Sequence, residues 1–258
     1  MRTQRRILGI VLLFAGACAC AEDVSLPEAT RVVLDNGAVL IVNEKTDVPL
    51  VGIEVLIRGG AVRDQEGKSG TASLFSGLVE RGAGERSAVD IAESVESVGG
   101  DLAVAAELES IRISAEFLSR DLGLALEIIG DLVTVPTLDA GELEILKERQ
   151  INLLRAAKDS DPGQLMPSYA ARFLFGDHPY GNPLSGSENS LAGITVDAIR
   201  ACFANEVGAD RRIGCVSGGV DTVGVGGRVA ARCGGWRGMR APHRAPTSWA
   251  PPTTRRWS

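Results

Sequence analysis

Hydrophobic and polar residues alternate in several short stretches of this chain, and an alternation of period two is typical of half-buried β-strands. Residues 31–43 form two such runs on either side of Asn36 and Gly37, a pair that tolerates positive φ and favours a tight hairpin turn. The other predicted strands cover 49–57, 101–107, 110–117 and 211–217.

Elsewhere, apolar residues recur every three to four positions, which predicts amphipathic helices. Ser87, Asp139 and Thr195 precede three of these stretches and are expected to cap them. Because proline is tolerated in a first helical turn, Pro162 is expected to open another helix. The predicted helices cover 88–98, 119–133, 140–158, a stretch beginning at 162, and 196–205. The order of elements favours an α+β fold with a largely antiparallel sheet covered by helices.

Composition narrows the classes of function. Hydrophobic residues make up 45% of the 258 positions and aromatic residues only 4%, so we expect an aliphatic core. Acidic residues outnumber basic ones by 33 to 27, and no basic platform with interleaved aromatics is present, which argues against nucleic acid as a partner. Cys202, Cys215 and Cys233 are compatible with one disulfide and a free thiol, or with three buried small side chains.

The N-terminus is predicted to be an export signal over residues 1–21. A basic start is followed by the apolar stretch 7–17, which is too short to span a bilayer comfortably, and by Ala19-Cys20-Ala21, a small-x-small cleavage pattern. A second interpretation is a lipoprotein signal that leaves a lipid anchor at Cys18. Either interpretation predicts that the protein leaves the cytoplasm, as a soluble periplasmic protein or as a lipoprotein.

Two motifs resemble those of one enzyme family. Residues 68–82 contain Gly70, Ala72, Leu78 and Gly82 in the frame of Gly-Leu-Ala-His-Phe-Leu-Glu-His-Met-Leu-Phe-x-Gly, the zinc-site helix of the insulinase/pitrilysin peptidases, an inverted-zincin family. Residues 176–181 resemble the family's G-x-H-P-Y-G segment. The resemblance extends from about residue 30 to 238. It implies a metallohydrolase half-domain like that of mitochondrial processing peptidase.

The residues that carry the family's chemistry are replaced. The two histidine ligands fall on Ser73 and Gly77, and the general-base glutamate falls on Ser76. The third ligand, a glutamate on a later helix, falls on Arg155 or within one residue of it. In an H-x-x-E-H helix, positions i, i+3 and i+4 share one face, so both histidines can bind one zinc ion. Here the same face carries two serine hydroxyls and a glycine, which has no side chain. We therefore expect no catalytic residue and no metal in this chain. A helix rich in small residues is common, so residues 68–82 alone do not indicate the family.

The resemblance implies a non-catalytic subunit that pairs with a homologous, zinc-bearing chain, binds peptide substrates and completes a chamber. Candidate peptide-binding residues are Arg155, His178 and Tyr180, although His178 is better explained by a hydrogen bond that orders the loop. Two other hypotheses remain: a structural or peptide-binding scaffold without a peptidase partner, and a truncated product without function. A charged set on the helix 140–158 is expected to form a solvated face: Glu142, Glu144, Lys147 and Glu148.

The last forty residues differ from the rest of the chain. After Asp221 there are seven arginines and no acidic residue, and all three tryptophans lie beyond residue 235. From about Gly218 the pattern no longer indicates a folded domain, although 234–238 resembles the motif that closes the family's half-domain. We expect a domain over 22–238 and a basic Pro/Arg/Trp tail over 239–258. The tail is either disordered or the product of a frameshift or truncation near 218–240.

Overall fold

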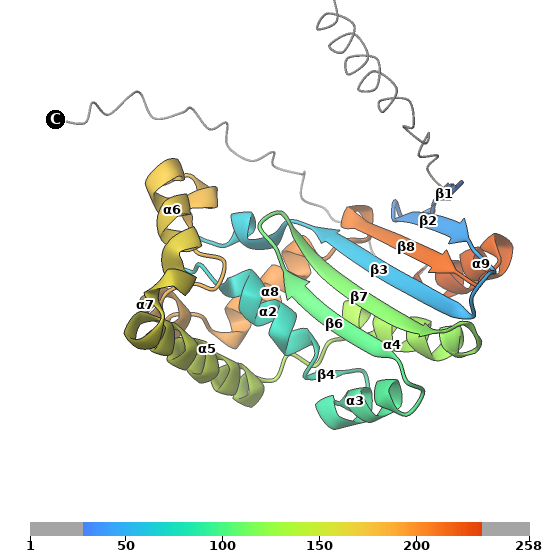
Figure 1. The fold of residues 1–258 in the computed structure, drawn as a ribbon, viewed down its shortest axis with the longest axis horizontal. Coiled ribbons are helices and arrows are strands. Elements are labelled where there is room, and N and C mark those ends of the chain that lie inside the picture. Colours follow the sequence, from blue (N-terminus) through green and yellow to red (C-terminus); the bar gives the residue numbers. More distant parts are fainter. Residues whose placement is uncertain (1–27, 234–258) are drawn as a thin grey trace, which may run out of the picture.

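The computed structural model describes residues 28–233, so the predicted signal peptide (1–21), Cys18 and the tail (239–258) lie outside the described residues. A six-stranded sheet in the order β1-β2-β8-β3-β7-β6 forms the centre of the fold (Figure 1). Its strands are β1 (Thr30–Val33), β2 (Val39–Glu44), β3 (Leu50–Arg58), β6 (Asp101–Ala106), β7 (Ser110–Leu118) and β8 (Arg212–Gly218). A separate two-stranded ribbon joins β4 (Gly82–Ala83) to β5 (Arg86–Ser87).

The predicted strands are confirmed, and so is the largely antiparallel sheet. The turn of the first hairpin uses Gly37 at φ 89°, and the Asn36 side-chain oxygen accepts a hydrogen bond from the Ala38 amide at 3.1 Å. Strand β8, the last in the sequence, lies between β2 and β3 and pairs parallel with β2, while every other neighbouring pair is antiparallel. The C-terminal part of the described chain therefore completes the middle of the sheet.

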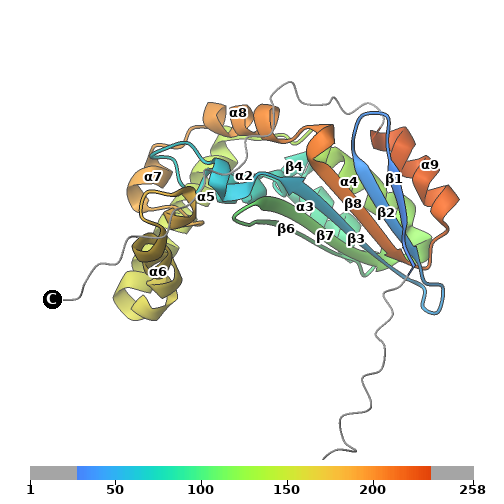
Figure 2. The same ribbon diagram turned by 90° about the horizontal axis from the view of Figure 1, so that it is seen from above.

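The helices cover one face of the sheet and extend beyond one of its ends (Figure 2). Alternate residues of β3 and β7, such as Ile53 and Ile113, are buried on the covered face with Phe75 of α2 and Ile128 of α4. The α-helices are α2 (Thr71–Val79), α3 (Ala88–Glu96), α4 (Leu122–Thr134), α5 (Ala140–Ser160), α6 (Met166–Phe175), α7 (Glu188–Ala192), α8 (Val196–Glu206) and α9 (Thr222–Cys233). No helix of residues 28–233 has both the length and the apolar character that a membrane crossing requires.

The predicted capping residues hold the helix starts. The Ser87 side chain accepts the Asp90 amide and the Asp90 carboxylate accepts the Ser87 amide, which is a capping box at the start of α3. Asp139 accepts the amides of Gly141 and Glu142 at the start of α5, and Thr195 accepts the Ala198 amide at the start of α8. Local sequence signals therefore predicted these boundaries correctly.

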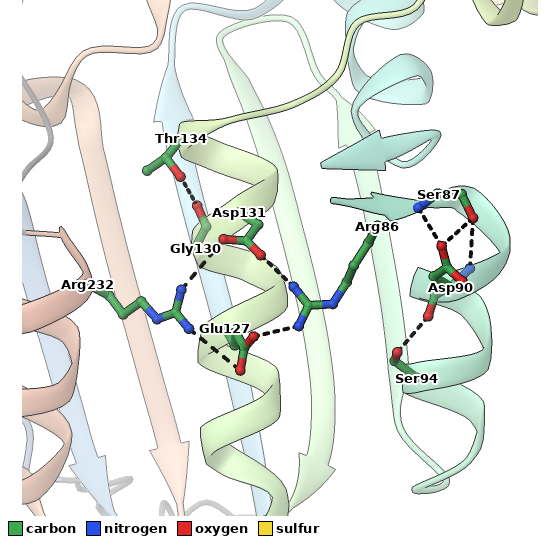
Figure 3. Close-up of polar contacts among 9 residues, drawn as sticks. All are labelled: Arg86, Ser87, Asp90, Ser94, Glu127, Gly130, Asp131, Thr134 and Arg232. Atoms are coloured by element: carbon green, nitrogen blue, oxygen red, sulfur yellow. Dashed lines mark hydrogen bonds and ion pairs between the residues drawn. The ribbon is translucent and has the colours of Figure 1, made fainter. Parts of the chain in front are cut away.

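The expectation that the folded pattern ends near Gly218 was wrong, because residues 222–233 form helix α9. Val225 is buried against the core, and Val229 packs beside it. At the end of the helix, the Arg232 guanidinium lies 3.6 Å from both Glu127 and Asp131 on α4, and Arg86 contacts the same two carboxylates from the other side (Figure 3). Glycines at 224, 226 and 227 concealed this helix, because glycine is a poor helix former and packing against the sheet outweighs it.

The charged set on α5 was expected to form a solvated face, and for Lys147 this expectation was wrong. Lys147 is only 8% exposed, and its ammonium group donates to the Glu144 carboxylate at 3.0 Å. It lies four residues after the buried Leu143 and so shares its face of the helix. The long aliphatic stem of lysine can cover apolar surface while its charged end reaches a partner, which explains this placement.

Candidate functional site

Helix α2, which carries the vestigial motif, is held at its start by a carboxylate from the preceding turn. Both Asp64 side-chain oxygens accept backbone amides, those of Gly70 at 2.8 Å, Thr71 at 3.1 Å and Ala72 at 2.9 Å. These amides have no partner within the helix, so Asp64 replaces a conventional cap. Burial of the carboxylate raises the pKa of Asp64 to about 6, although the three hydrogen bonds oppose that shift.

The motif face of α2 is partly covered, with Ser76 buried and Ser73 and Gly77 half-buried. Ser76 is 5% exposed, and its hydroxyl donates to the Ser73 carbonyl oxygen at 2.9 Å, so this group is satisfied within the helix. A Cβ placed on Gly77 would lie 3.6 and 3.7 Å from the terminal methyl carbons of Leu146 on α5. The two helices therefore approach closely where the motif positions lie, with a leucine facing the glycine.

These residues do not fit a zinc ion. Zinc in proteins is bound by thiolate sulfur, imidazole nitrogen or carboxylate oxygen, and a catalytic site needs three such ligands. Ser73 and Ser76 offer neutral hydroxyls, Gly77 offers no side chain, and the neighbouring side chain on α5 is Leu146. Within residues 28–233, no three His, Cys, Asp or Glu side chains gather in a way that could hold a metal. No step of metal chemistry can therefore be derived for this helix pair.

Arg155, expected at the position of the third ligand, lies on the exposed side of α5. Its side chain is 61% exposed and donates to Glu188 of α7 at 2.8 Å, and Lys158 reaches the other oxygen of the same carboxylate at 2.6 Å. Hydrogen bonds from Lys158 and Arg155 lower the pKa of Glu188. On the inner side of the helix, Ile151 and Leu154 pack against the core at this level. Arg155 thus ties α5 to α7 in this structure.

His178 and Tyr180, the other candidate peptide-binding residues, lie together. The His178 Nδ1 atom accepts the Tyr180 amide at 3.2 Å, and the two rings are 4.9 Å apart in an edge-on arrangement, with Phe175 packed beside them. The Tyr180 hydroxyl donates to the Glu109 carboxylate in the β6–β7 turn, and this bond raises the pKa of Tyr180. The loop that carries them is therefore attached to the tip of the β6–β7 hairpin.

Strand β6 ends the sheet and lies beside α2 (Figure 1). In its antiparallel pairing with β7, the Glu107 amide donates inward to Ser110, so the backbone groups of Leu102, Val104 and Ala106 point away from β7. One of these outward amides, that of Val104, donates to the Glu80 carboxylate at 2.6 Å. Burial raises the pKa of Glu80. The sequence gives no signal for this contact, because it joins residues 24 positions apart.

Together, these features define an α+β domain in which the helix that resembles a metal-site helix lacks ligands. Residues 39–188 match the family model described as "Insulinase (Peptidase family M16)". The chain therefore belongs to the M16 peptidase family.

Several known proteins are similar to this chain over part of their own length. An uncharacterized zinc protease of Mycobacterium tuberculosis is 28% identical over 196 residues, which are 76% of this chain and 44% of the relative. The structure titled "peptidase M16 inactive domain" from Pseudomonas fluorescens superimposes with a TM-score of 0.78 at 21% identity, over 85% of this chain and 54% of that one. The first half of the periplasmic protease PqqL from Escherichia coli gives a TM-score of 0.75 at 15% identity, over 87% and 50%. This chain spans less than half the length of the curated relatives that it matches.

Proposed function

We propose that this protein is an exported, non-catalytic member of an M16 peptidase assembly that binds peptide beside a zinc-bearing homologous partner. One observation carries the proposal: the helix face that would hold the metal is made of Ser73, Ser76 and Gly77, and Leu146 packs against it. A general base and a polarising metal are both required for hydrolysis of this type, and these positions supply neither. The zinc is assigned to the partner.

Peptide binding is supported by the free edge of the sheet beside α2. An edge strand presents unpaired amides and carbonyls, and an extended peptide can add to it as a further strand through main-chain hydrogen bonds. The outward groups of Leu102 and Ala106 are suited to that role. The loop with His178 and Tyr180 is attached to the tip of the same hairpin and would contact a side chain of the bound peptide. Arg155 would contribute only after releasing Glu188.

The comparisons support one part of this proposed role, that of a peptidase half-domain. One structural neighbour is described as an inactive domain and another as the first half of a periplasmic protease. These descriptions agree with a half-domain that works beside another. Export, as a periplasmic protein or as a lipoprotein anchored at Cys18, and the identity of the partner belong to the proposal.

Two measurements on the purified chain test the proposal. Metal analysis after dialysis is expected to find substoichiometric zinc, and a fluorogenic peptide library is expected to remain uncut. Fluorescence anisotropy with fluorescein-labelled casein, an unfolded polypeptide, is expected to show saturable binding. Stoichiometric zinc together with hydrolysis by the chain alone would overturn the non-catalytic assignment. Absence of casein binding would overturn the peptide-binding role and favour a purely structural one.

A further inference from the structure

A partly open cavity lies under the C-terminal half of α9. Its walls are aliphatic side chains of the sheet, of α4 and of α9, among them Leu40, Ile53, Val216, Leu126, Ile129 and Val229. The enclosed part measures about 50 Å³, and the hollow reaches about 560 Å³ when it is counted out to open solvent. Sites for small-molecule ligands usually measure about 300–1,000 Å³. The enclosed part is too small for such a ligand, so a single large side chain that enters it and covers its mouth suits it better.

The last turn of α9 lies at this cavity. Val229 and Arg232 both line it, and Arg232 approaches α4 near the turn that carries Gly130 (Figure 3). A Cβ placed on Gly130 would lie 3.6 Å from the Arg232 Cδ atom and would meet no other side chain within 4 Å. Helix α9 and the described residues end at the next position, Cys233. The chain therefore continues into residues 234–258 from beside the mouth of the cavity.

We propose that Trp236 fills this cavity. The apolar face of α9 runs through Val225 and Val229, and Arg232 continues it at the cavity. Trp236 is the next position in the same spacing of four, three and four residues. The three residues after Cys233 can span at most about 10 Å, so the indole stays within reach of the last turn of α9. This inference goes beyond the proposed function and does not depend on it.

The residues around Trp236 favour it over other occupants. Gly234 and Gly235 separate it from α9, and glycine at a helix end lets the chain reverse direction so that a following apolar side chain packs back on the last turn. A covered indole removes about 150–250 Å² of surface from water, which an aliphatic hollow at that end of the helix provides. The folded domain then extends at least to residue 236.

Tryptophan fluorescence of the full 258-residue chain tests the proposal, because all three tryptophans lie after the described residues. Trp249→Phe/Trp257→Phe leaves Trp236 as the only indole. Its emission is expected to be blue-shifted from that of the same variant in urea and to resist quenching by acrylamide. Trp236→Phe/Trp257→Phe, which leaves Trp249, is the matched control and should emit close to its wavelength in urea. A Trp236 emission equal to that in urea, or equal protection of the two tryptophans, would overturn the proposal.

Two substitutions on α4 test whether the cavity is the place where the indole is buried. Gly130→Leu puts a side chain at the cavity beside Arg232 and is expected to shift the Trp236 emission toward that in urea. Gly123→Leu is the matched control, because Gly123 is exposed on the same helix and a Cβ there meets nothing within 4 Å. Leucine forms helices better than glycine, so both variants should fold, as circular dichroism can verify. The same Trp236 emission in both variants would place the indole elsewhere and contradict the proposal.

A stability measurement is independent of the α4 variants. Trp236→Ala should lower the urea midpoint of unfolding, because it empties the cavity again. Trp249→Ala, which removes the same side chain from a position that the proposal does not place in the cavity, should leave the midpoint unchanged. Equal midpoints for the two variants would show that Trp236 does not pack against the domain.

Discussion

Leu146 on α5 lies in van der Waals contact with the space above Gly77 on α2, with its methyl carbons 3.6 and 3.7 Å from where a Cβ would begin. These distances are ordinary van der Waals contacts, so a methyl group would fit there without moving Leu146. Leu146 thus lies over the position where the family resemblance places the second histidine, and a side chain longer than a methyl group there would meet it.

Gly77→Ala is expected to stabilise the protein. Glycine inside a helix costs about 0.5–1 kcal/mol relative to alanine, and the new methyl group meets Leu146 at an ordinary contact distance. Gly77→His is expected to destabilise it instead, because the imidazole must displace Leu146. Urea unfolding followed by circular dichroism measures both changes.

The double variant Gly77→His/Leu146→Ala provides the control for that prediction. If the leucine is the obstacle, shortening it should recover part of the loss caused by histidine, as a coupling energy between two residues in contact. A Gly77→His variant as stable as Gly77→Ala would show that α5 does not close this face.

Glu80→Ala is expected to increase the affinity for fluorescein-labelled casein. The carboxylate occupies the outward amide of Val104 and so competes with a peptide strand for the edge of β6. Fluorescence anisotropy measures the binding. Glu85→Ala, at an exposed acidic residue outside the edge, removes the same charge and should leave the affinity unchanged. An equal gain in both variants would indicate a general charge effect rather than release of the strand edge.

The sequence predicted the strands and most of the helix boundaries because these depend on local signals. Asn36 and Gly37 set a turn, and Ser87 and Asp139 set helix starts, through neighbours two or three residues away. The contacts of the candidate site could not be predicted in this way. Glu80 with Val104, and Tyr180 with Glu109, join elements that only the tertiary fold brings together.

Residue type misled the sequence-based prediction at two places. Lys147 is charged, but its position four residues after Leu143 places it on the buried face of α5. Helix α9 is rich in glycine, but Val225 and Val229 have the spacing of an apolar stripe. Residue type suggested solvent exposure for Lys147 and a tail outside the folded domain for the residues after Gly218, whereas position in the helix determined burial in both cases.

Stability is expected to depend on pH through Asp64. Its pKa is about 6 in the folded chain, above the ordinary value of 3.8, so the folded state binds more protons between these values. The free energy of unfolding should therefore fall as the pH rises from about 4 to about 6, by about 2–3 kcal/mol for this carboxyl alone. Urea titrations at both ends of this range measure the change, and Asp64→Asn should remove most of it.

Asp90→Asn is the matched control for this pH dependence. Hydrogen bonds from the Ser87 side chain and backbone lower the pKa of Asp90, so its contribution is present above its ordinary pKa and is lost as the pH falls. The variant should therefore leave the change between pH 4 and 6 largely intact. If stability instead rises with pH through Asp64, the three amide hydrogen bonds outweigh the cost of burying the charge.

The two arginines that hold α4 between the β4–β5 ribbon and α9 are expected to differ in importance (Figure 3). Arg86 donates to Glu127 at 2.5 Å and to Asp131 at 2.6 Å, whereas Arg232 approaches both at 3.6 Å and is more exposed, 43% against 26%. Arg86→Met should therefore cost about 1–3 kcal/mol, because it leaves two neighbouring carboxylates without close donors, and Arg232→Met less than about 1 kcal/mol. Urea unfolding at low and high salt measures both.

Salt should reduce the effect of Arg232→Met the most, since exposed pairs are screened more strongly. Equal losses from the two substitutions would mean that the docking of α9 contributes as much to α4 as the short contacts of Arg86.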